Sequence, residues 1–476
     1  MGSTSFQFFG FAFAVVLVYN LSRSVVYRQA VLLAASLLFL ASFSLGPKSF
    51  LPFAAFLLLG YLGVRAAPSL PRYGFPLLLC VTVGVFVWLK KYAFVPGPMF
   101  LRFSYVTVGL SYILFRLLHL MIDRRSGDVP KGVTLLSYLT YTLNFTTLVS
   151  GPIQPYQEFE KTWSVLPENL NFGKVALAVE RVVTGLFKTN VLALLISTLQ
   201  SRALESLAAP QPLAGRAGCG VLALASYPIF LYCNFSGYID IVIGIAQLLG
   251  IALPENFNRP FSSDNFINFW SRWHITLSNW LKTYVYNPLL MTLMRRFPSP
   301  ALETLWLAVA LFVTFFLVGL WHGQTSEFVF FGFLQGFGVA ANRVYQIQMT
   351  KLLGRKPFQA LSKNHLYVTF TRGFTFTWFT FTLLWFWSNW GQIGWIRATL
   401  GGAEALVWLA IFAGATVLLE AWESFRASAL AVHCDGAPVV YSMYWRAALG
   451  TALLVVVLAV SLLMNQSAPE IVYKAF

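Results

Sequence analysis

Stretches without an Asp, Glu, Lys or Arg recur along the whole chain, and they restrict its fold more than any other feature. They include Ser5–Ser22, Gln29–Pro47, Tyr73–Leu89, Ala217–Ile239, Thr304–Ser326, Gly373–Ile396, Ala405–Leu419 and Ala447–Pro469. About 20 apolar residues in a helix cross a hydrocarbon layer of about 30 Å. A β-barrel would show short alternating segments instead, and these stretches do not alternate. We therefore predict an all-α polytopic integral membrane protein with about ten to thirteen candidate spans.

The composition agrees with a membrane location. Hydrophobic residues make up 58% of the 476 residues, charged residues make up 11%, and the mean hydropathy is +0.68. Soluble domains carry roughly a quarter charged residues. The net charge of +16, from 33 basic and 17 acidic residues, fits basic cytoplasmic loops that face anionic lipid headgroups. We expect no nucleic-acid partner, because no basic run with interleaved aromatics lies outside the apolar stretches.

Polar residues interrupt the apolar pattern mainly in the middle of the chain. We predict a single membrane domain over residues 1–476, with peripheral N-terminal helices at 1–100, a catalytic core at 100–345 and C-terminal helices at 346–476. The first apolar stretch has no basic segment before it, so it is expected to stay as a helix. Cys80, Cys219 and Cys233 lie in apolar stretches and are expected in the core rather than in disulfides.

Two basic segments predict a helical hairpin in this middle region. The loop between Arg343 and Arg372 contains basic residues and no acidic ones, and Arg295 with Arg296 forms a second basic turn. If both are cytoplasmic, the chain between them enters the membrane over Thr304–Leu320 and returns over Phe328–Asn342. The bend, Gly319–Ser326, contains His322.

His322 is the strongest candidate for a catalytic residue. It follows a long apolar run, and an ionisable side chain inside a membrane costs several kcal/mol, so such a residue is a functional candidate by default. Imidazole is also the side chain best suited to moving a proton at neutral pH. The alternative is an interfacial histidine that binds a backbone carbonyl. The other histidines, His119, His365 and His433, are expected at a helix end or in solvated loops.

His274 is the second candidate. Phe266, Trp270, Trp273, Leu277, Trp280 and Tyr284 recur at helical spacing around it. This pattern predicts an amphipathic interfacial helix. His274 borders the aromatic stripe, where it either faces a cavity or belongs to the helix surface.

Two further segments place polar groups in apolar runs. Leu148–Pro155 interrupts a helix with Gly-Pro and contains Ser150, and Asn234–Asp240 contains Ser236 and Asp240. Either segment serves a substrate or only helix packing. Motifs typical of serine hydrolases, P-loop ATPases, zinc proteases and dinucleotide-binding proteins are absent from the sequence.

These segments together resemble the membrane-bound O-acyltransferase (MBOAT) family. The matching stretches, at residues 147–153, 185–188, 234–244, 254–261, 269–278 and 320–323, run from Thr-Leu-Val-Ser-Gly-Pro-Ile to Leu-Trp-His-Gly. The bacterial branch of the family acylates cell-envelope polymers, by alginate O-acetylation or by D-alanyl transfer to teichoic acids. The resemblance implies about eleven transmembrane helices with re-entrant and interfacial pieces. It also matches the family's signature histidine to His322 and a second polar position to His274.

The resemblance implies an O-acyltransferase of a bacterial cytoplasmic membrane that moves an acetyl group from a cytoplasmic thioester to an exported polysaccharide hydroxyl or to a periplasmic partner protein. We expect His322 and His274 to be catalytic. Residues expected to bind substrate are Trp270, Arg272, Asn268, Trp321, Ser150, Ser236 and Asp240.

No metal and no tightly bound cofactor is expected, because acetyl-CoA or an acyl-carrier thioester would be the donor substrate. D-alanyl transfer from a carrier protein to a cell-wall polymer stays open as an alternative. So does a transporter or flippase without bond-forming chemistry, although no inverted repeat supports it.

Overall fold

The computed structural model describes residues 6–44, 46–129, 132–164, 171–434, 437–438, 440, 442–464 and 469. Most of these residues are helical, and the strands among them form one two-residue antiparallel ladder between β1 (His433–Cys434) and β2 (Ala437–Pro438). The predicted all-α class is therefore confirmed. Within the described residues, six helical segments are long and apolar enough to cross a membrane, and shorter apolar helices accompany them. The expected number of about eleven spans stays a prediction.

The chain forms two compact units. The first comprises Met1–Asn190, Asn234–Pro254 and Val457–Phe476, and the second comprises Val191–Cys233 and Glu255–Val456. The helix α10 (Leu213–Leu248), the π-helical turn η3 (Phe187–Ala193) and α20 (Met443–Met464) each contribute residues to both units. The predicted division into peripheral, catalytic and C-terminal stretches stays a prediction.

The other helices of the first unit pack around one apolar core. They are α1 (Phe6–Tyr19), α2 (Val25–Ala41), η1 (Pro47–Phe50), α3 (Leu51–Ala66), α4 (Gly74–Leu89), η2 (Gly97–Met99), α5 (Leu110–Ser126), α6 (Leu135–Leu143), α7 (Tyr156–Ser164) and α8 (Phe172–Leu186). Rings from three of its segments meet in the core, where the centroid of Phe39 lies 5.7 Å from Phe8 and 6.2 Å from Phe145.

A buried non-helical segment follows α6 in this unit. Residues 144–154 are buried although they form no regular helix. Backbone groups at membrane depth must find partners within the protein, and Arg116 of α5 supplies some of them. Its guanidinium donates to the carbonyls of Tyr141 (3.1 Å), Thr142 (2.8 Å) and Thr147 (2.8 Å). The helix break predicted at Leu148–Pro155 is confirmed.

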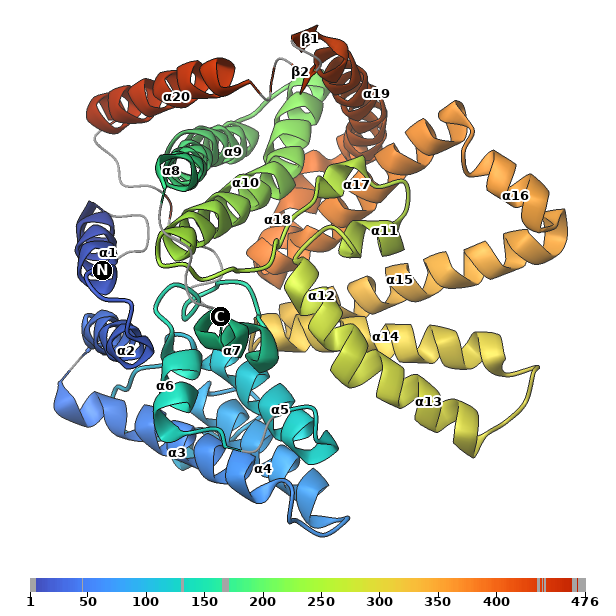
Figure 1. The fold of residues 1–476 in the computed structure, drawn as a ribbon. Helices are drawn as coiled ribbons and strands as arrows, with labels where there is room; N and C mark the ends of the chain where they lie inside the picture. The colour runs from blue at the N-terminus through green and yellow to red at the C-terminus, as the bar shows by residue number, and fades with distance from the viewer. Residues whose placement is uncertain are drawn as a thin grey trace. The chain divides into compact units, whose positions relative to one another are not determined.

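The second unit contains the remaining elements. They are α9 (Leu194–Ala208), η4 (Pro260–Ser262), α11 (Phe266–Trp270), α12 (Ile275–Leu281), η5 (Lys282–Tyr286), α13 (Asn287–Arg296), α14 (Glu303–His322), α15 (Ser326–Leu353), α16 (Arg355–Leu361), α17 (His365–Trp387), α18 (Trp390–Leu400), η6 (Gly401–Ala403) and α19 (Glu404–Ala431). In this unit α15 packs against both α14 and α17, and α17 packs against α19 (Figure 1).

The predicted hairpin is confirmed by α14 and α15, which lie side by side (Figure 1). Its second limb is longer than predicted, because α15 continues without a break through the basic residues to Leu353. Two glycines let the helices approach closely. A Cβ built on Gly319 would lie 2.3 Å from the Cα of Gly332, so the backbones touch where the hairpin closes. This close approach lies one helical turn before His322.

Large apolar side chains are exposed on many helices. On α19, Val417 and Leu418 are 66% and 70% exposed, and at the end of α20, Leu462 and Leu463 are 81% and 84% exposed. Exposed apolar surface on this scale marks a membrane interface. The chain is therefore a multi-pass membrane protein. Of the three cysteines expected in the core, Cys233 is buried, Cys219 is half-buried and Cys80 is exposed on an outer face of α4, and the described residues form no disulfide with any of them.

Candidate active site

His322 is the last residue of α14 and is only 2% exposed. Aromatic rings surround its imidazole, with centroids of Trp321 at 4.5 Å, Phe386 at 5.1 Å and Phe331 at 6.0 Å. Phe331 belongs to α15 and Phe386 to α17, so three helices of the second unit fix the position of this ring. The expectation that His322 lies in the interior of the fold is confirmed, and its catalytic role stays a prediction.

Gly323 directly after His322 is required by packing. A Cβ at this position would lie 2.0 Å from the ring of Phe328, so no larger residue fits without moving that ring. Phe328 in turn packs edge-on against Phe386 at 5.7 Å, and Phe386 contacts His322. The glycine of the Trp-His-Gly sequence therefore belongs to the same packed group of rings as the histidine.

His274 lies in a turn between two short helices, not within one helix. The continuous amphipathic helix predicted over Phe266–Tyr284 is wrong, because α11 ends at Trp270 and α12 begins at Ile275. His274 has a positive φ of 45°, a left-handed conformation that is strained for a residue with a Cβ. Such strain persists only where surrounding contacts hold it, and it is frequent at functional sites.

The aromatic stripe predicted around His274 is buried rather than interfacial. Phe266, Trp270, Trp273, Leu277 and Trp280 are at most 9% exposed. They pack against neighbouring elements, as Trp273 does on Phe379 of α17 at 5.2 Å. The stripe therefore anchors the two short helices inside the second unit.

Trp321 brings the two histidines together. Its ring centroid lies 6.3 Å from that of His274 and 4.5 Å from that of His322. The two imidazoles are also close enough to interact electrostatically. Each is at most 2% exposed. Two histidines far apart in the sequence thus belong to one buried group around Trp321, and their shared catalytic role stays a prediction.

Asn256 is the residue next to this pair that the sequence analysis did not select. It is fully buried, and its backbone carbonyl accepts from the N–H of Ile275 at 3.0 Å. Its Oδ1 lies 3.2 Å from His274 Nδ1 and accepts from the backbone N–H (3.1 Å) and the hydroxyl (2.8 Å) of Thr276. The signal was available, because Asn256 lies in the Pro254–Phe261 stretch that carried the family resemblance.

These contacts assign the protonation of His274. A backbone N–H can only donate, so the atom that receives the Thr276 N–H is the oxygen of the Asn256 amide. The Nδ1 of His274 must then donate to this oxygen, and the hydrogen of the neutral ring sits on Nδ1. Burial lowers the pKa of His274 to about 3, which keeps the ring neutral at physiological pH. Its Nε2 consequently carries a lone pair that can accept a hydrogen bond.

Trp270, whose predicted role in substrate binding stays a prediction, makes a buried polar contact. Its indole N–H donates to Gln335 of α15 at 3.3 Å, and the amide of Gln335 donates to Thr382 of α17 at 2.8 Å. Gln335 and Thr382 are fully buried. This chain of hydrogen bonds joins α11 to the two long helices that contact His322.

Asn268 and Arg272 also lie on or directly after α11. The amide of Asn268 donates to the carboxylate of Asp264 at 2.6 Å, and its backbone N–H is capped by Asn265. The backbone carbonyl of Arg272 accepts from Asn258 at 2.9 Å. These contacts order the start and end of α11, and a role in substrate binding stays a prediction for both residues.

Ser150, Ser236 and Asp240 belong to the first unit. Ser150 and Ser236 are buried, and the described residues offer their hydroxyl oxygens no hydrogen-bond partner. Asp240 is ion-paired with Lys188 at 2.7 Å and with Arg181 at 3.2 Å. The substrate-binding role predicted for these three residues stays a prediction.

The remaining histidines have other surroundings. His119 lies inside α5 rather than at a helix end and bonds the hydroxyl of Tyr141 at 2.9 Å. His365 begins α17 and pairs with Glu420 at 3.0 Å, while the side chain of His433 lies outside the described residues. Among the described residues, no three His, Cys, Asp or Glu side chains are grouped in a way that could hold a metal ion.

The family model of the membrane-bound O-acyltransferases (MBOAT) matches residues 124–386, which is more than half of the chain. The chain belongs to this family. The matched segment contains His274, His322 and all their described neighbours named above. The resemblance noted from short sequence motifs is thereby confirmed.

Curated relatives of two kinds are similar to the chain. A protein named probable alginate O-acetylase from Pseudomonas fluorescens is 30% identical over 322 residues, 67% of this chain and 61% of the relative. A teichoic acid D-alanyltransferase from Streptococcus thermophilus is 30% identical over 239 residues, 49% of this chain and 56% of the relative. One from Bacillus subtilis is 27% identical over 236 residues, 47% and 56% of the two chains. The chain thus spans about half to three fifths of the length of these relatives.

Proposed function

We propose that this chain is an O-acyltransferase that moves an acyl group, most simply acetyl, from a thioester on the cytoplasmic side of a bacterial cytoplasmic membrane to a hydroxyl on the other side. The observation that carries the proposal is the buried contact of His274 and His322 with Trp321, inside the segment that matches the family. Buried neutral imidazoles near one another suit proton transfer, and structural packing alone gives no reason to place two there.

In the proposed reaction His322 acts as the general base. Its neutral imidazole takes the proton of the acceptor hydroxyl as that oxygen attacks the thioester carbonyl. The tetrahedral intermediate then collapses, the C–S bond breaks, and the imidazolium returns the proton to the leaving thiolate. The products are an ester and a free thiol, and the histidine regains its starting state.

His274 has a different role in this proposal. With its hydrogen on Nδ1 and donated to Asn256, its Nε2 can accept a hydrogen bond but cannot donate one. The tautomer therefore favours orientation of a substrate N–H or O–H over stabilisation of an oxyanion, which needs a donor. The left-handed backbone at His274 fixes the direction of the ring for this task.

The names of the relatives suggest the acceptor. A bacterial exopolysaccharide acetylation system would provide an exported sugar hydroxyl or a periplasmic partner protein as acceptor, with acetyl-CoA as donor. A second candidate, D-alanyl transfer from a carrier protein to a cell-wall polymer, is favoured by the similarity to teichoic acid D-alanyltransferases. Both use the same thioester chemistry and the same histidines.

The test is thiol release by the purified full chain in detergent, with acetyl-CoA and with a D-alanyl carrier-protein thioester as separate donors. Wild-type protein, His322→Ala and His365→Ala are compared after gel filtration confirms that each is monodisperse. His365 is the matched control, because its side chain is 72% exposed and its ring pairs with Glu420 rather than with the aromatic residues around His322. We expect release from one donor by the wild type and His365→Ala, and at least about a hundredfold less by His322→Ala.

Other outcomes separate the alternatives. Release from the carrier thioester alone would select the D-alanyl reaction. Equal release by His322→Ala and wild type would remove His322 from the mechanism. A transporter or flippase would release thiol from neither donor, even after a membrane extract supplies the acceptor.

A further inference from the structure

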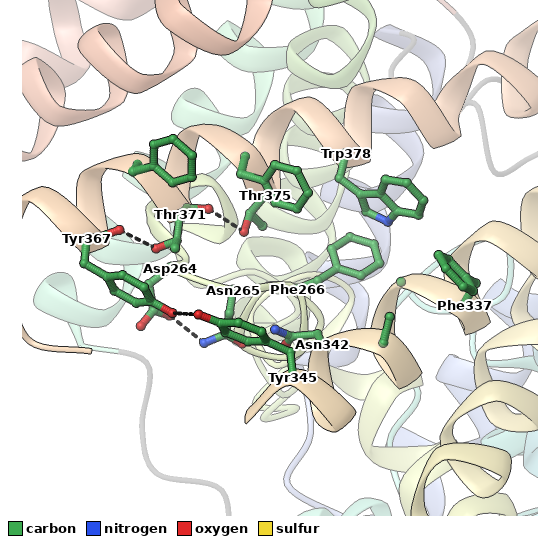
Figure 2. A pocket seen from close by; sticks show the side chains of 14 residues that line it. Asp264, Asn265, Phe266, Phe337, Asn342, Tyr345, Tyr367, Thr371, Thr375 and Trp378 are labelled. Atoms are coloured by element: carbon green, nitrogen blue, oxygen red, sulfur yellow. Dashed lines mark hydrogen bonds between the residues drawn. The ribbon is translucent and has the colours of Figure 1, made fainter. Parts of the chain in front are cut away.

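A cavity of about 510 Å³ opens in the second unit between α15, α17 and the residues before α11. Its walls are rich in aromatic side chains, including Phe337 on α15 and Trp378 on α17 (Figure 2). Phe374 on α17 also lines it. Phe337 and Phe374 are 50% and 59% exposed. In a membrane protein such exposed rings face acyl chains, so the cavity opens toward lipid. Its size lies in the range typical of sites for small ligands.

Polar groups gather at one end of this cavity. The phenols of Tyr345 and Tyr367 share a hydrogen bond of 3.0 Å, and Asp264 and Asn342 lie beside them (Figure 2). Only one phenol donates in the pair, so the accepting phenol keeps an O–H that donates to no described residue. The Oδ1 of Asn342 accepts from the backbone of Ile267 at 3.3 Å, which leaves its NH₂ group at the cavity wall.

Asp264 is the charged group of this end. Its Oδ1 accepts from the amides of Asn265 at 2.9 Å and Asn268 at 2.6 Å, and among the described residues no basic side chain forms a salt bridge with it. Glu420 of α19, by contrast, is paired with Arg372. The cavity therefore offers an uncompensated carboxylate for a cation, with N–H and O–H donors for an anion next to it.

The polar end lies within the basic segment from Arg343 to Arg372, which is mostly helical, and the apolar end lies further along α15 and α17, away from this segment. Residues 345 and 337 of α15 are separated by about 12 Å along the helix axis. The cavity thus has polar groups at one end and aromatic rings along the helices. A phospholipid has the same order of groups, with its headgroup at the membrane surface and its chain in the hydrocarbon.

We propose that this cavity holds one phospholipid with a primary-amine headgroup, of the phosphatidylethanolamine type. Its ammonium group binds Asp264, its phosphate oxygens accept from the free phenol O–H and from Asn342, and one acyl chain runs along Phe337 and Trp378. A choline headgroup fits less well, because it has no N–H to donate to the carboxylate. A glycerol headgroup fits less well, because it supplies no cation.

The experiment is native mass spectrometry of the delipidated full chain, titrated with dioleoyl lipids that carry ethanolamine, N-methylethanolamine, choline or glycerol headgroups. The wild type should bind the ethanolamine lipid about three- to fivefold more tightly than the choline lipid, the strength of one hydrogen bond to the carboxylate, because both headgroups carry the same positive charge. Affinity should fall stepwise as methyl groups replace N–H. This series needs no variant and remains decisive if a variant fails to fold.

Two test variants, each with a control variant, then locate the site. Asp264→Asn should abolish the preference for ethanolamine over choline, while Glu205→Gln, which removes an exposed carboxylate on α9, should keep it. Ala341→Phe, which fills the cavity from α15, should weaken binding of all four lipids, and Ala341→Ser should not. Equal affinity of the wild type for all headgroups, tightest binding of the glycerol lipid, or an unchanged preference in Asp264→Asn would each overturn the proposal.

Discussion

The Nδ1 of His274 lies 3.2 Å from the Oδ1 of Asn256, and this oxygen also receives the backbone N–H of Thr276. The backbone donor fixes the oxygen as an acceptor, so the imidazole must present Nδ1–H to Asn256 and a lone pair on Nε2. A single amide thereby sets the tautomer of a buried histidine and helps to hold its strained backbone. The relationship between these two residues can be tested without knowledge of the acceptor.

Removal of this acceptor should change the reaction through His274. In Asn256→Ala the Nδ1–H loses its partner in a buried site, and the tautomer with hydrogen on Nε2 becomes accessible. We expect kcat for thiol release to fall by at least about tenfold, the range of a misplaced acid or base. Asn258→Ala is the matched control, because Asn258 is exposed on the same segment. Equal kcat values for the two variants would contradict the role of Asn256.

Replacement of the same amide by a carboxylate should change the pH profile. Burial lowers the pKa of His274 to about 3, so the wild-type ring stays neutral from about pH 5 to about pH 8. In Asn256→Asp the new negative charge stabilises the imidazolium and raises the pKa of His274. Protonation removes the Nε2 lone pair, so activity should be lost as the pH falls. The pH dependence of thiol release, with Asn258→Asp as control, measures this, and identical profiles would count against it.

The packing after His322 should also be sensitive. Gly323→Ala places a Cβ 2.0 Å from the Phe328 ring, so this ring must move, and Phe328 packs on the Phe386 ring that contacts His322. Misplacement of a catalytic group by about 1 Å can cost a hundredfold in rate, and we expect a loss of about ten- to a hundredfold in thiol release. Gly394→Ala is the control, since its Cβ meets no atom within 4 Å. Similar activity of both variants would contradict this coupling.

Parts of this site were predictable because they depend on local sequence. The apolar run before Trp321 predicts a first limb over Thr304–Leu320, and α14 matches it closely, although the helix continues to His322 instead of ending before the predicted bend. The basic residues on either side predict the hairpin. The predicted second limb is too short, because a run of basic residues without acidic ones is typical of a loop. In the structure Arg343 and Lys351 lie within α15.

Other parts depend on tertiary contacts that the sequence pattern does not show. The segment Trp270–His274 contains no Gly or Pro to signal a helix break, and the aromatic spacing continues across it, so a single helix was predicted. The break exists because residues 256–258 pair with residues 272–275 through backbone hydrogen bonds. Likewise, Tyr345 and Tyr367 come from different helices, and only the packing of α15 on α17 joins them.

The buried guanidinium of Arg116 should be essential for the first unit. Arg116→Leu leaves the carbonyls of Tyr141, Thr142 and Thr147 without their donor, and each unsatisfied buried group costs about 1–3 kcal/mol. We expect faster proteolysis within residues 144–155 and a clearly lower melting temperature in detergent. Arg102→Leu, a change at an exposed arginine, serves as the control. Unchanged protection of the segment in Arg116→Leu would show that other contacts hold it.

Substitution of Asp240 can show whether its ion pairs with Lys188 and Arg181 are structural. Asp240→Asn leaves Lys188 and Arg181 without their shared carboxylate, which at 15% side-chain exposure should cost about 1–3 kcal/mol. If the pairing alone matters, Asp240→Asn with Lys188→Met should recover part of the lost melting temperature, because one of the two cations that shared this carboxylate is removed. The folded fraction of both proteins should then keep the wild-type KM for the donor. A raised KM in the stabilised double variant would instead support the substrate-binding role predicted for Asp240 from the sequence.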